Sequence, residues 1–292
     1  MVKAFLKNHL FLWLVLLVVG ADTLLWYFKF SPGQWIEYTY NGAALILILF
    51  ELLIPRNSSW NLITCNGIKF RETIVEAFFF FWSGFFASTV TYAFSDWAAD
   101  HIRSYLHITS QVSVHWIFQG LMIVFGIDLL RYWLHRWMHK NPFLWRFHAL
   151  HHMPERLGTL TSTRTHPVDD FILYVPELIF LFTLGFDRVV VASLYSVIWV
   201  ISLVKHSNIE FPATVFSRHF QLPRYHLIHH NYQDDKSPTY NFSEVLTFWD
   251  KVFGTYKDHP IQTTHRVGVA SEKPRSFLRE FFGWLVLPVQ RM

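Results

Sequence analysis

Long apolar runs separated by short polar segments dominate the first two thirds of this chain. A transmembrane helix needs roughly 20 apolar residues, with a range of about 17 to 25. Four runs reach that length, at about 9–28, 38–55, 73–94 and 115–134. The first is not interpreted as a signal peptide, because its apolar stretch continues past residue 20 without a small-x-small cleavage site. We therefore expect four membrane-spanning helices, the first of them retained.

Two shorter apolar runs follow, at 171–186 and 188–204, and only Asp187 with the flanking Gly185 and Arg188 separates them. Both runs are short for full spans. We expect a tight helical hairpin that dips into the bilayer or just crosses it. A buried hairpin of a soluble domain is the alternative, and the four preceding runs disfavour it because they already commit the chain to lipid.

The composition supports a membrane protein and excludes several classes of site. Hydrophobic residues make up 52% of the 292 residues and charged residues only 16%, whereas about a quarter of a soluble domain is charged. The net charge of +4 is scattered and forms no Lys/Arg cluster, so nucleic acid is not an expected partner. Cys65 is the only cysteine. Disulfides, thiolate zinc sites and iron–sulfur clusters held by this chain alone are therefore excluded.

Charge predicts the orientation of the spans. Basic residues gather in the N-terminal tail and the 55–72 loop, whereas the 29–37 and 95–112 loops balance theirs with acidic residues. The positive-inside rule places the tail and the 55–72 loop in the cytoplasm. Four crossings then return the chain to the cytoplasm at residue 135, and the hairpin leaves and returns. The basic residues concerned are Lys3, Lys7, Arg56, Lys69 and Arg71.

Histidines gather on this cytosolic side in three groups with helical spacing. One is an H-x3-H pair, and the others are identical H-x2-HH triples. Positions i, i+3 and i+4 of a helix are neighbours, with Cβ atoms about 5–6 Å apart. Each group is therefore expected to aim its imidazoles at one point, which favours metal binding over packing. The groups are His135 and His139; His148, His151 and His152; and His226, His229 and His230.

Eight imidazoles exceed the four ligands of a tetrahedral structural zinc site, so we expect two metal ions. Two single histidines join by position, His166 directly before the hairpin and His206 directly after it. For both, a solvated interfacial histidine is the alternative. Neutral imidazole binds iron, copper, zinc and nickel, so the ligand type does not select the metal. The predicted fold is thus an all-α polytopic membrane helical bundle with a cytosolic histidine-rich cap that holds a di-metal site.

The other histidines lack this grouping, and we interpret them as solvated or interfacial residues: His9, His101, His107, His115, His219, His259 and His265. Aromatic residues near the grouped histidines either line a substrate cleft or form an ordinary interfacial belt. These are Trp133, Trp137, Phe143, Trp145 and Phe147.

Three aspartates are candidates for orienting the histidines, because a ligating histidine normally donates its other ring N–H to a carboxylate or carbonyl. Asp128 lies two helical turns before His135 on the same predicted face. An ionisable residue inside an apolar run is costly and often functional. We expect Asp128 to orient a ligand or gate the site, with an ion pair to Arg131 as the alternative. Asp169 and Asp250 are weaker candidates for the orienting role.

From Asp128 to Tyr256 the chain resembles the fatty acid hydroxylase/sterol desaturase superfamily of integral membrane non-haem di-iron enzymes. Two departures from the family pattern leave the histidine boxes untouched. Asp169 stands where the family often has glutamate, and "NFS" at 241–243 stands where it often has Asn-Tyr-Gly. The segments that carry the resemblance are "DLLRYWLHRWMH", "LWRFHALHH", "RTHPVDD", "KHSNIEFP", "PRYHLIHHN" and "NFSEVLTFWDKVFGTY".

The resemblance implies an oxidoreductase that hydroxylates or desaturates a C–H bond of a lipid drawn from the bilayer. Its implied cofactors are two iron ions, with dioxygen as co-substrate. Electrons come from a separate donor of cytochrome b5-, ferredoxin- or reductase-type. The implied membrane is the bacterial inner membrane or the endoplasmic reticulum. The implied regions are an N-terminal transmembrane region (1–110), a catalytic domain (111–260) and a C-terminal interfacial tail (261–292).

Two other classes stay open at this point. A histidine-rich membrane metal transporter normally binds its ion near the bilayer midplane, on helices with polar breaks, whereas these histidines follow the spans. A zinc-dependent membrane hydrolase is the other class. Its usual H-E-x-x-H motif pairs two zinc ligands with a general base, and this chain lacks that motif.

Overall fold

The computed structural model describes residues 2–60, 67–212, 214–215, 217–231, 240–258 and 267–268. Within these ranges the chain forms helices and two isolated β-bridges, so the predicted all-α class is confirmed. The interfacial helix predicted within 261–292 lies outside the described residues, as do His259 and His265.

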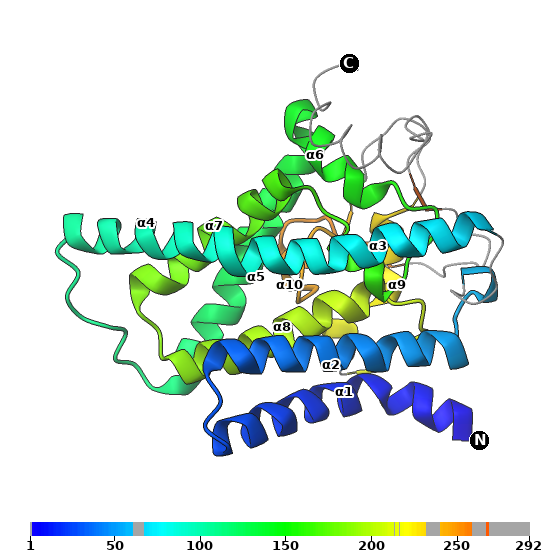
Figure 1. Ribbon diagram of the computed structural model, residues 1–292, viewed down its shortest axis with the longest axis horizontal. Helices are drawn as coiled ribbons and strands as arrows, with labels where there is room; N and C mark the ends of the chain where they lie inside the picture. The colour runs from blue at the N-terminus through cyan, green and yellow to red at the C-terminus, as the bar shows by residue number, and fades with distance from the viewer. Residues whose placement is uncertain are drawn as a thin grey trace.

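Figure 1 shows the order of the elements along the chain. Short 3-10 turns are η1, η3 and η4, and η2 is a π-helical turn. In chain order the elements are α1 (Val2–Tyr27), α2 (Pro32–Leu53), η1 (Ser58–Trp60), α3 (Gly67–Phe86), η2 (Ala87–Thr91), α4 (Tyr92–Tyr105), α5 (Trp116–Lys140), α6 (Pro142–His152), η3 (Thr159–Thr163), α7 (Pro167–Leu184), α8 (Arg188–His206), η4 (Ser217–His219), α9 (Pro223–His229) and α10 (Phe248–Val252).

Within the described ranges, five helical segments are long and apolar enough to cross a membrane, which supports a multi-pass membrane protein. The four predicted spans are all among them, and only the second helix of the predicted hairpin joins them. The first helix of the hairpin, α7, is not among the five segments, because its 18 residues include the acidic Asp169, Asp170 and Glu177. The five segments are His9–Tyr27, Pro32–Leu53, Glu72–Tyr105, Trp116–Lys140 and Arg188–His206.

The third span is longer than its apolar pattern indicates. The pattern ends near residue 94, but α3, η2 and α4 continue as one long helix, and Glu72–Tyr105 has 34 residues (Figure 1). At 1.5 Å per residue this is about 51 Å, well beyond the hydrocarbon thickness of about 30 Å. The extension is amphipathic: Ser95 and Ala99 are buried, Trp97 is exposed, and α4 packs on α7. More than half of the predicted 95–112 loop, up to Tyr105, is therefore helix.

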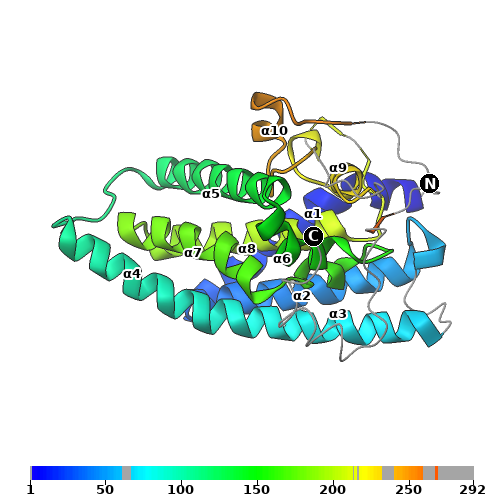
Figure 2. The same ribbon diagram turned by 90° about the horizontal axis from the view of Figure 1, so that it is seen from above.

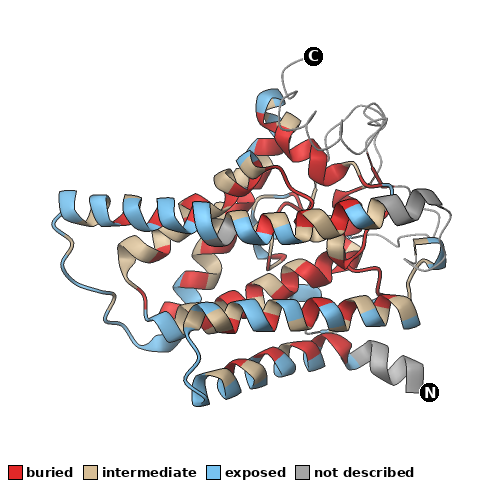
Figure 3. Cartoon of the chain, viewed as in Figure 1, coloured by how far each residue is buried: buried red, intermediate tan, exposed pale blue. Residues whose placement is uncertain are grey.

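The helices pack in layers that enclose the hairpin. α7 lies between α5 and the long α3–α4 helix (Figure 2), and α2 packs along α8 with α1 on its outer side. Buried residues gather where α5, α6, α8 and α9 meet, whereas α1 and α4 present many exposed side chains (Figure 3). Large apolar side chains are exposed on α1, among them Trp13, Leu16 and Leu17, as expected of a surface that faces lipid.

Local signals set the helix ends that carry the histidines. α5 runs past the apolar pattern to Lys140, so that its last turns hold the first histidine pair. Asn141 caps α6 by accepting from the N–H groups of Phe143 and Leu144. Gly185 ends α7 with φ +66°, where only glycine avoids Cβ strain, and Asp187 caps α8. The tight predicted hairpin is confirmed.

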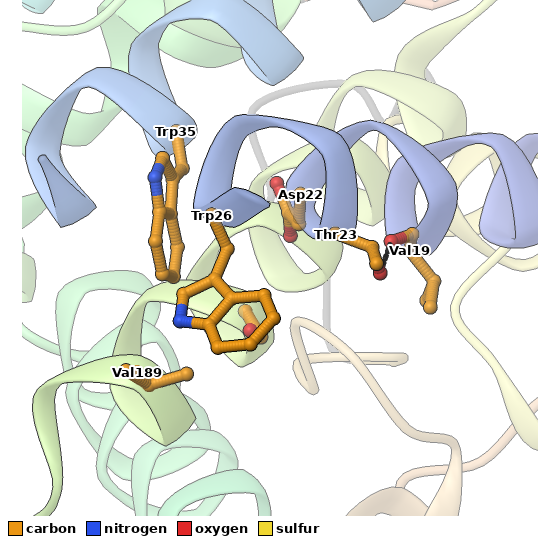
Figure 4. A pocket seen from close by; sticks show the side chains of 7 residues that line it. Val19, Asp22, Thr23, Trp26, Trp35 and Val189 are labelled. Carbon is orange, nitrogen blue, oxygen red and sulfur yellow. Dashed lines mark hydrogen bonds between the residues drawn. The ribbon is translucent and has the colours of Figure 1, made fainter. Parts of the chain in front are cut away.

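A cavity of about 230 Å³ lies between α1, α2 and the start of α8 (Figure 4). Val189 in its wall and His206 are 17 residues apart on α8, which is about 26 Å along the helix axis. The cavity is therefore remote from the grouped histidines and is not part of the site described next. Its lining residues are Val19, Asp22, Thr23, Trp26, Trp35, Val189 and Ser193.

Candidate metal centre

The structure brings nine of the ten predicted ligands together in two adjoining groups. They come from the end of α5, from α6, from the end of α8, and from α9 with the residue that follows it. Within each group the candidate ligand atoms lie within 4.8 Å of one another, and all nine residues are buried. Group one is His135, His139, His148, His152 and His229; group two is His151, His206, His226 and His230.

The expectation that each triple aims at one point is wrong. His148 and His152 belong to group one, whereas His151 belongs to group two; in the second triple, His226 and His230 separate from His229 in the same way. On an α-helix, position i+4 lies about 40° from position i, whereas position i+3 lies about 60° to the other side. The i and i+4 members stay together, and the i+3 member turns away. Each triple therefore contributes to both groups.

Backbone and carboxylate acceptors fix which ring nitrogen of several histidines carries the proton. The Nδ1–H of His135 donates to the Phe242 carbonyl at 2.8 Å, that of His229 to the Tyr240 carbonyl at 2.8 Å, and that of His206 to the Ser202 carbonyl at 2.9 Å. A carbonyl only accepts, so the Nε2 of each neutral ring carries the lone pair. This is the arrangement in which a metal-binding histidine is held by its other nitrogen.

The nitrogens that remain fit a bound cation. In group two the Nε2 atoms of His206 and His226 lie 2.8 Å apart, and those of His206 and His151 lie 3.1 Å apart. Nitrogens about 2.1 Å from a shared metal ion lie roughly 3 Å apart at coordination angles near 90°. In group one the Nε2 atoms of His148, His152 and His229 are buried and have no hydrogen-bond partner. Buried orphan acceptors are costly, and a metal ion in group one would remove that cost.

The groups also adjoin. The rings of His152 and His230, one from each group, stack at a centroid distance of 4.2 Å. His229 and His226 stack across the same boundary at 5.2 Å. Two metal ions held by the two groups would therefore lie next to each other, with stacked imidazoles from both groups between them.

Burial, followed by the charges of neighbouring groups, lowers the pKa of two histidines on α6 and of the three histidines of the second triple well below its usual value. These rings stay neutral at physiological pH, which is the form that binds metal. The residues concerned are His151, His152, His226, His229 and His230.

We predict that the protein is destabilised as the pH falls below about 6.5, the ordinary histidine pKa of an unfolded chain. Because the folded-state pKa is lowered, the unfolded chain binds more protons below that value, and stability present above it is lost. Thermal unfolding in detergent between pH 8 and pH 5 tests this. A variant with the exposed His101, His107 and His219 changed to Gln should lose stability over the same range. A midpoint that stays constant down to pH 5 contradicts the prediction.

His166 lies outside both groups. It is the N-cap of α7, and its Nδ1 accepts a hydrogen bond from the N–H of Val168 at 3.0 Å. A neutral ring that accepts at Nδ1 carries its proton on Nε2. The structure thus gives this residue a capping contact, and its ring lies 4.9 Å from that of Phe147.

Asp128 and Asp250 hold the segment that orients His135. The carboxylate of Asp128 accepts from the backbone N–H groups of Glu244, Val245 and Leu246 at 2.8–3.1 Å. Asp250 accepts from the N–H of Phe242, whose carbonyl in turn accepts from His135. Arg131, the alternative partner of Asp128, is instead bidentate to Glu177.

A buried ion pair beside both groups was not predicted from the sequence. Lys205 precedes His206 of group two, and its ammonium pairs with Glu244, whose other oxygen lies 3.6 Å from the Nδ1 of His135. Burial favours a raised pKa for Glu244, but Lys205, His135 and Arg131 outweigh it and lower the pKa to about 2. The one available signal was a lysine at the end of an apolar run, which usually indicates a side chain that reaches for the interface.

Asp169, a weaker candidate in the sequence, touches a group-one histidine directly. Its carboxylate lies 3.0 Å from the Nδ1 of His148. We predict that Asp169→Asn lowers the metal affinity of group one by about 10- to 100-fold, because His148 loses an anionic acceptor. Competition with a calibrated chelator measures the affinity.

The matched control is Asp170→Asn. Asp170 is equally buried and adjacent in the chain, but it accepts from Ser83. Its metal affinity should equal that of the unaltered protein. Equal losses in the two variants contradict the orienting role of Asp169.

Known proteins resemble this chain over the segment that holds the site. Residues 120–255 match the fatty acid hydroxylase family. An ornithine lipid hydroxylase of Rhizobium tropici is 27% identical over 286 residues, which is 92% of this chain and 81% of that protein. A lathosterol oxidase of Rattus norvegicus is 30% identical over 50% of this chain and 47% of its own length. A sphinganine C4-monooxygenase of Arabidopsis thaliana is 29% identical over 55% of this chain and 61% of its own length. No solved structure matches.

These matches confirm the resemblance: residues 120–255 form a fatty acid hydroxylase domain, and the relatives belong to the fatty acid hydroxylase/sterol desaturase superfamily. Every one of the relatives named above is a hydroxylase, an oxidase or a monooxygenase. The prediction that the chain is an oxidoreductase is confirmed with them.

Proposed function

We propose that this protein is a membrane di-iron oxygenase that uses dioxygen and external electrons to oxidise a C–H bond of a membrane lipid. The observation that carries the proposal is the pair of adjoining, buried groups of five and four imidazoles. A pair of iron ions in such a site supplies the oxidising power that side-chain acid–base chemistry lacks for an unactivated C–H bond.

The protein's own residues hold, orient and enclose the pair. Nine imidazoles bind, and the acceptors described above fix the tautomers of four of them, His135, His148, His206 and His229. Burial of every ligand keeps bulk water from the reacting centre, so that reactive species are spent on the lipid and not on solvent. The Lys205–Glu244 ion pair places one positive and one negative charge beside the two groups.

Hydroxylation of a polar membrane lipid is the form of the reaction that the comparisons favour. The relative that spans 92% of this chain is a lipid hydroxylase, whereas the sterol oxidase aligns with only half of it. A lipid enters from the bilayer, because the five spans place the helical bundle within it.

We propose that the histidines face the cytoplasm, where the donor of electrons is found. The excess of Lys and Arg in the N-terminal tail and in the 55–72 loop supports this orientation. We also propose the division into a transmembrane region at 1–110, a catalytic domain at 111–260 and a tail at 261–292. His166 stays a candidate ligand only if its capping contact opens when metal binds.

The test is turnover in lipid nanodiscs that contain ornithine lipid, with a reductant and dioxygen supplied. We expect consumption of dioxygen and a lipid product heavier by one oxygen atom, with the label of ¹⁸O₂ incorporated. A product lacking two hydrogens assigns the chain to desaturation instead. If iron-loaded protein consumes no dioxygen with any of ornithine lipid, sterol or sphingoid base, the proposal is wrong.

A further inference from the structure

One aromatic side chain connects the surface with group one. The indole of Trp145 on α6 lies 5.0 Å from the ring of His139, 5.3 Å from that of His152 and 6.2 Å from that of His148, between ring centroids. All three histidines belong to group one and are at most 6% exposed. Trp145 itself is only partly buried. The indole therefore spans the layer between solvent and ligands.

The other aromatic ring in contact with the groups does not reach the surface. Among the described residues, Phe242 is the second ring that contacts grouped histidines, and it is 2% exposed. The predicted cleft residues have other surroundings: Trp133, Trp137 and Phe143 are exposed, and Phe147 contacts His166. Trp145 is thus the one member of that aromatic set with both an outer and an inner face.

Basic residues adjoin Trp145. Lys140 is exposed at the end of α5, five residues before Trp145, and the partly exposed Arg146 directly follows Trp145 on α6. No Asp or Glu occurs from 129 to 154. The acidic residues at the start of α7, which packs on α6, are buried and present no charge to solvent.

We propose that Trp145 and this basic surface form the port through which electrons reach the metal pair, and that the partner is an acidic one-electron carrier protein. The inference rests on the proposed di-iron function. Each metal ion accepts one electron and the carrier gives up one electron per encounter, so two encounters reduce the pair. No bond or proton changes at Trp145. Electrons enter through group one, because the indole contacts that group alone, and pass to group two across the stacked rings of His152 and His230.

Opposite charge accelerates such an encounter and makes its rate depend on ionic strength. Electron transfer itself weakens steeply with distance through the protein. An indole in van der Waals range of two ligands therefore shortens the path, and its removal leaves a gap between carrier and ligands.

Stopped-flow reduction of the iron-loaded full chain by a reduced, acidic [2Fe–2S] ferredoxin tests the port, with rates expressed per bound iron. We expect Trp145→Leu to slow reduction by at least 10-fold, and Trp145→Phe to slow it less. Lys140→Glu should lower the rate and flatten its salt dependence. Trp137→Leu is the matched control, since this exposed tryptophan contacts no grouped histidine in the described structure, and it should leave the rate unchanged.

Reduction by dithionite separates this inference from the proposed function. Dithionite is small, and we expect it to reduce every variant at the rate of the unaltered protein. Two results contradict the proposed function: the purified protein contains no iron, or its dithionite-reduced iron is not reoxidised by dioxygen. Normal ferredoxin rates in Trp145→Leu, together with an unchanged salt dependence in Lys140→Glu, overturn the port and leave the basic, aromatic surface as a membrane anchor. A reduced cytochrome b5 used in place of the ferredoxin decides which acidic carrier reacts faster.

Discussion

Replacing His229 by alanine is expected to abolish turnover and to remove the metal ion of group one. His229 is a group-one ligand whose orphan Nε2 is buried and whose Nδ1 is held by the Tyr240 carbonyl. Loss of an orienting partner alone costs 10- to 100-fold in metal affinity or activity, so we expect loss of the ligand itself to cost more than about 100-fold. His151→Ala should do the same to group two. Product formation and metal content per chain are the two measurements.

His219→Ala is the matched control for these variants. His219 lies between the hairpin and the second triple but is exposed and belongs to neither group. Membrane insertion, metal content and turnover should all match those of the unaltered chain. Turnover that survives His229→Ala or His151→Ala shows that the assignment of ligands is wrong.

Breaking the Lys205–Glu244 pair is expected to have the largest effect on stability. Lys205 is buried and Glu244 is largely buried, with side-chain exposures of 2% and 12%. Removing one partner leaves an uncompensated buried charge, which costs about 3–5 kcal/mol. We expect Lys205→Met and Glu244→Gln each to lower the free energy of unfolding by roughly that amount. Urea unfolding in detergent micelles measures it.

The double variant Lys205→Met/Glu244→Gln distinguishes a paired charge from simple packing. Because it leaves no lone charge, its loss of stability should be smaller than the sum of the single losses. The exposed pair Arg224–Asp258 is the control, since both side chains are about 30% exposed. Asp258→Asn should cost less than about 1 kcal/mol. Additive losses at Lys205 and Glu244 contradict a direct interaction.

Much of the fold follows from the apolar pattern, because lipid imposes a length on each span. The apolar pattern predicted the four long spans and the turn at Gly185–Asp187. The pattern failed where helices leave the lipid. α4 continues to Tyr105 because Ser95 and Ala99 pack inward, and hydropathy does not detect burial against a neighbouring helix. The same failure ended the α5 run at residue 134, short of the histidine pair.

The site was predictable as a set of residues and less so as a geometry. Helical spacing identified the histidines, since i and i+4 imidazoles share a face. It did not show that His151 and His229 turn to the opposite group, because a 3.6-residue helix spreads three positions over about 100°. It also missed Glu244 and the carbonyls of Phe242 and Tyr240. These contacts join residues far apart in the chain, and no local pattern encodes them.

The central claim is that two adjoining groups of imidazoles hold a pair of iron ions. Quantification of metals in protein purified in detergent, by mass spectrometry and per chain, tests it most directly. The account predicts two irons per chain, falling to one or none in His229→Ala and His151→Ala. A single zinc per chain, with no iron bound under iron-replete expression, contradicts the account and favours a membrane zinc hydrolase. Rapid, reversible exchange of the metal favours a transporter.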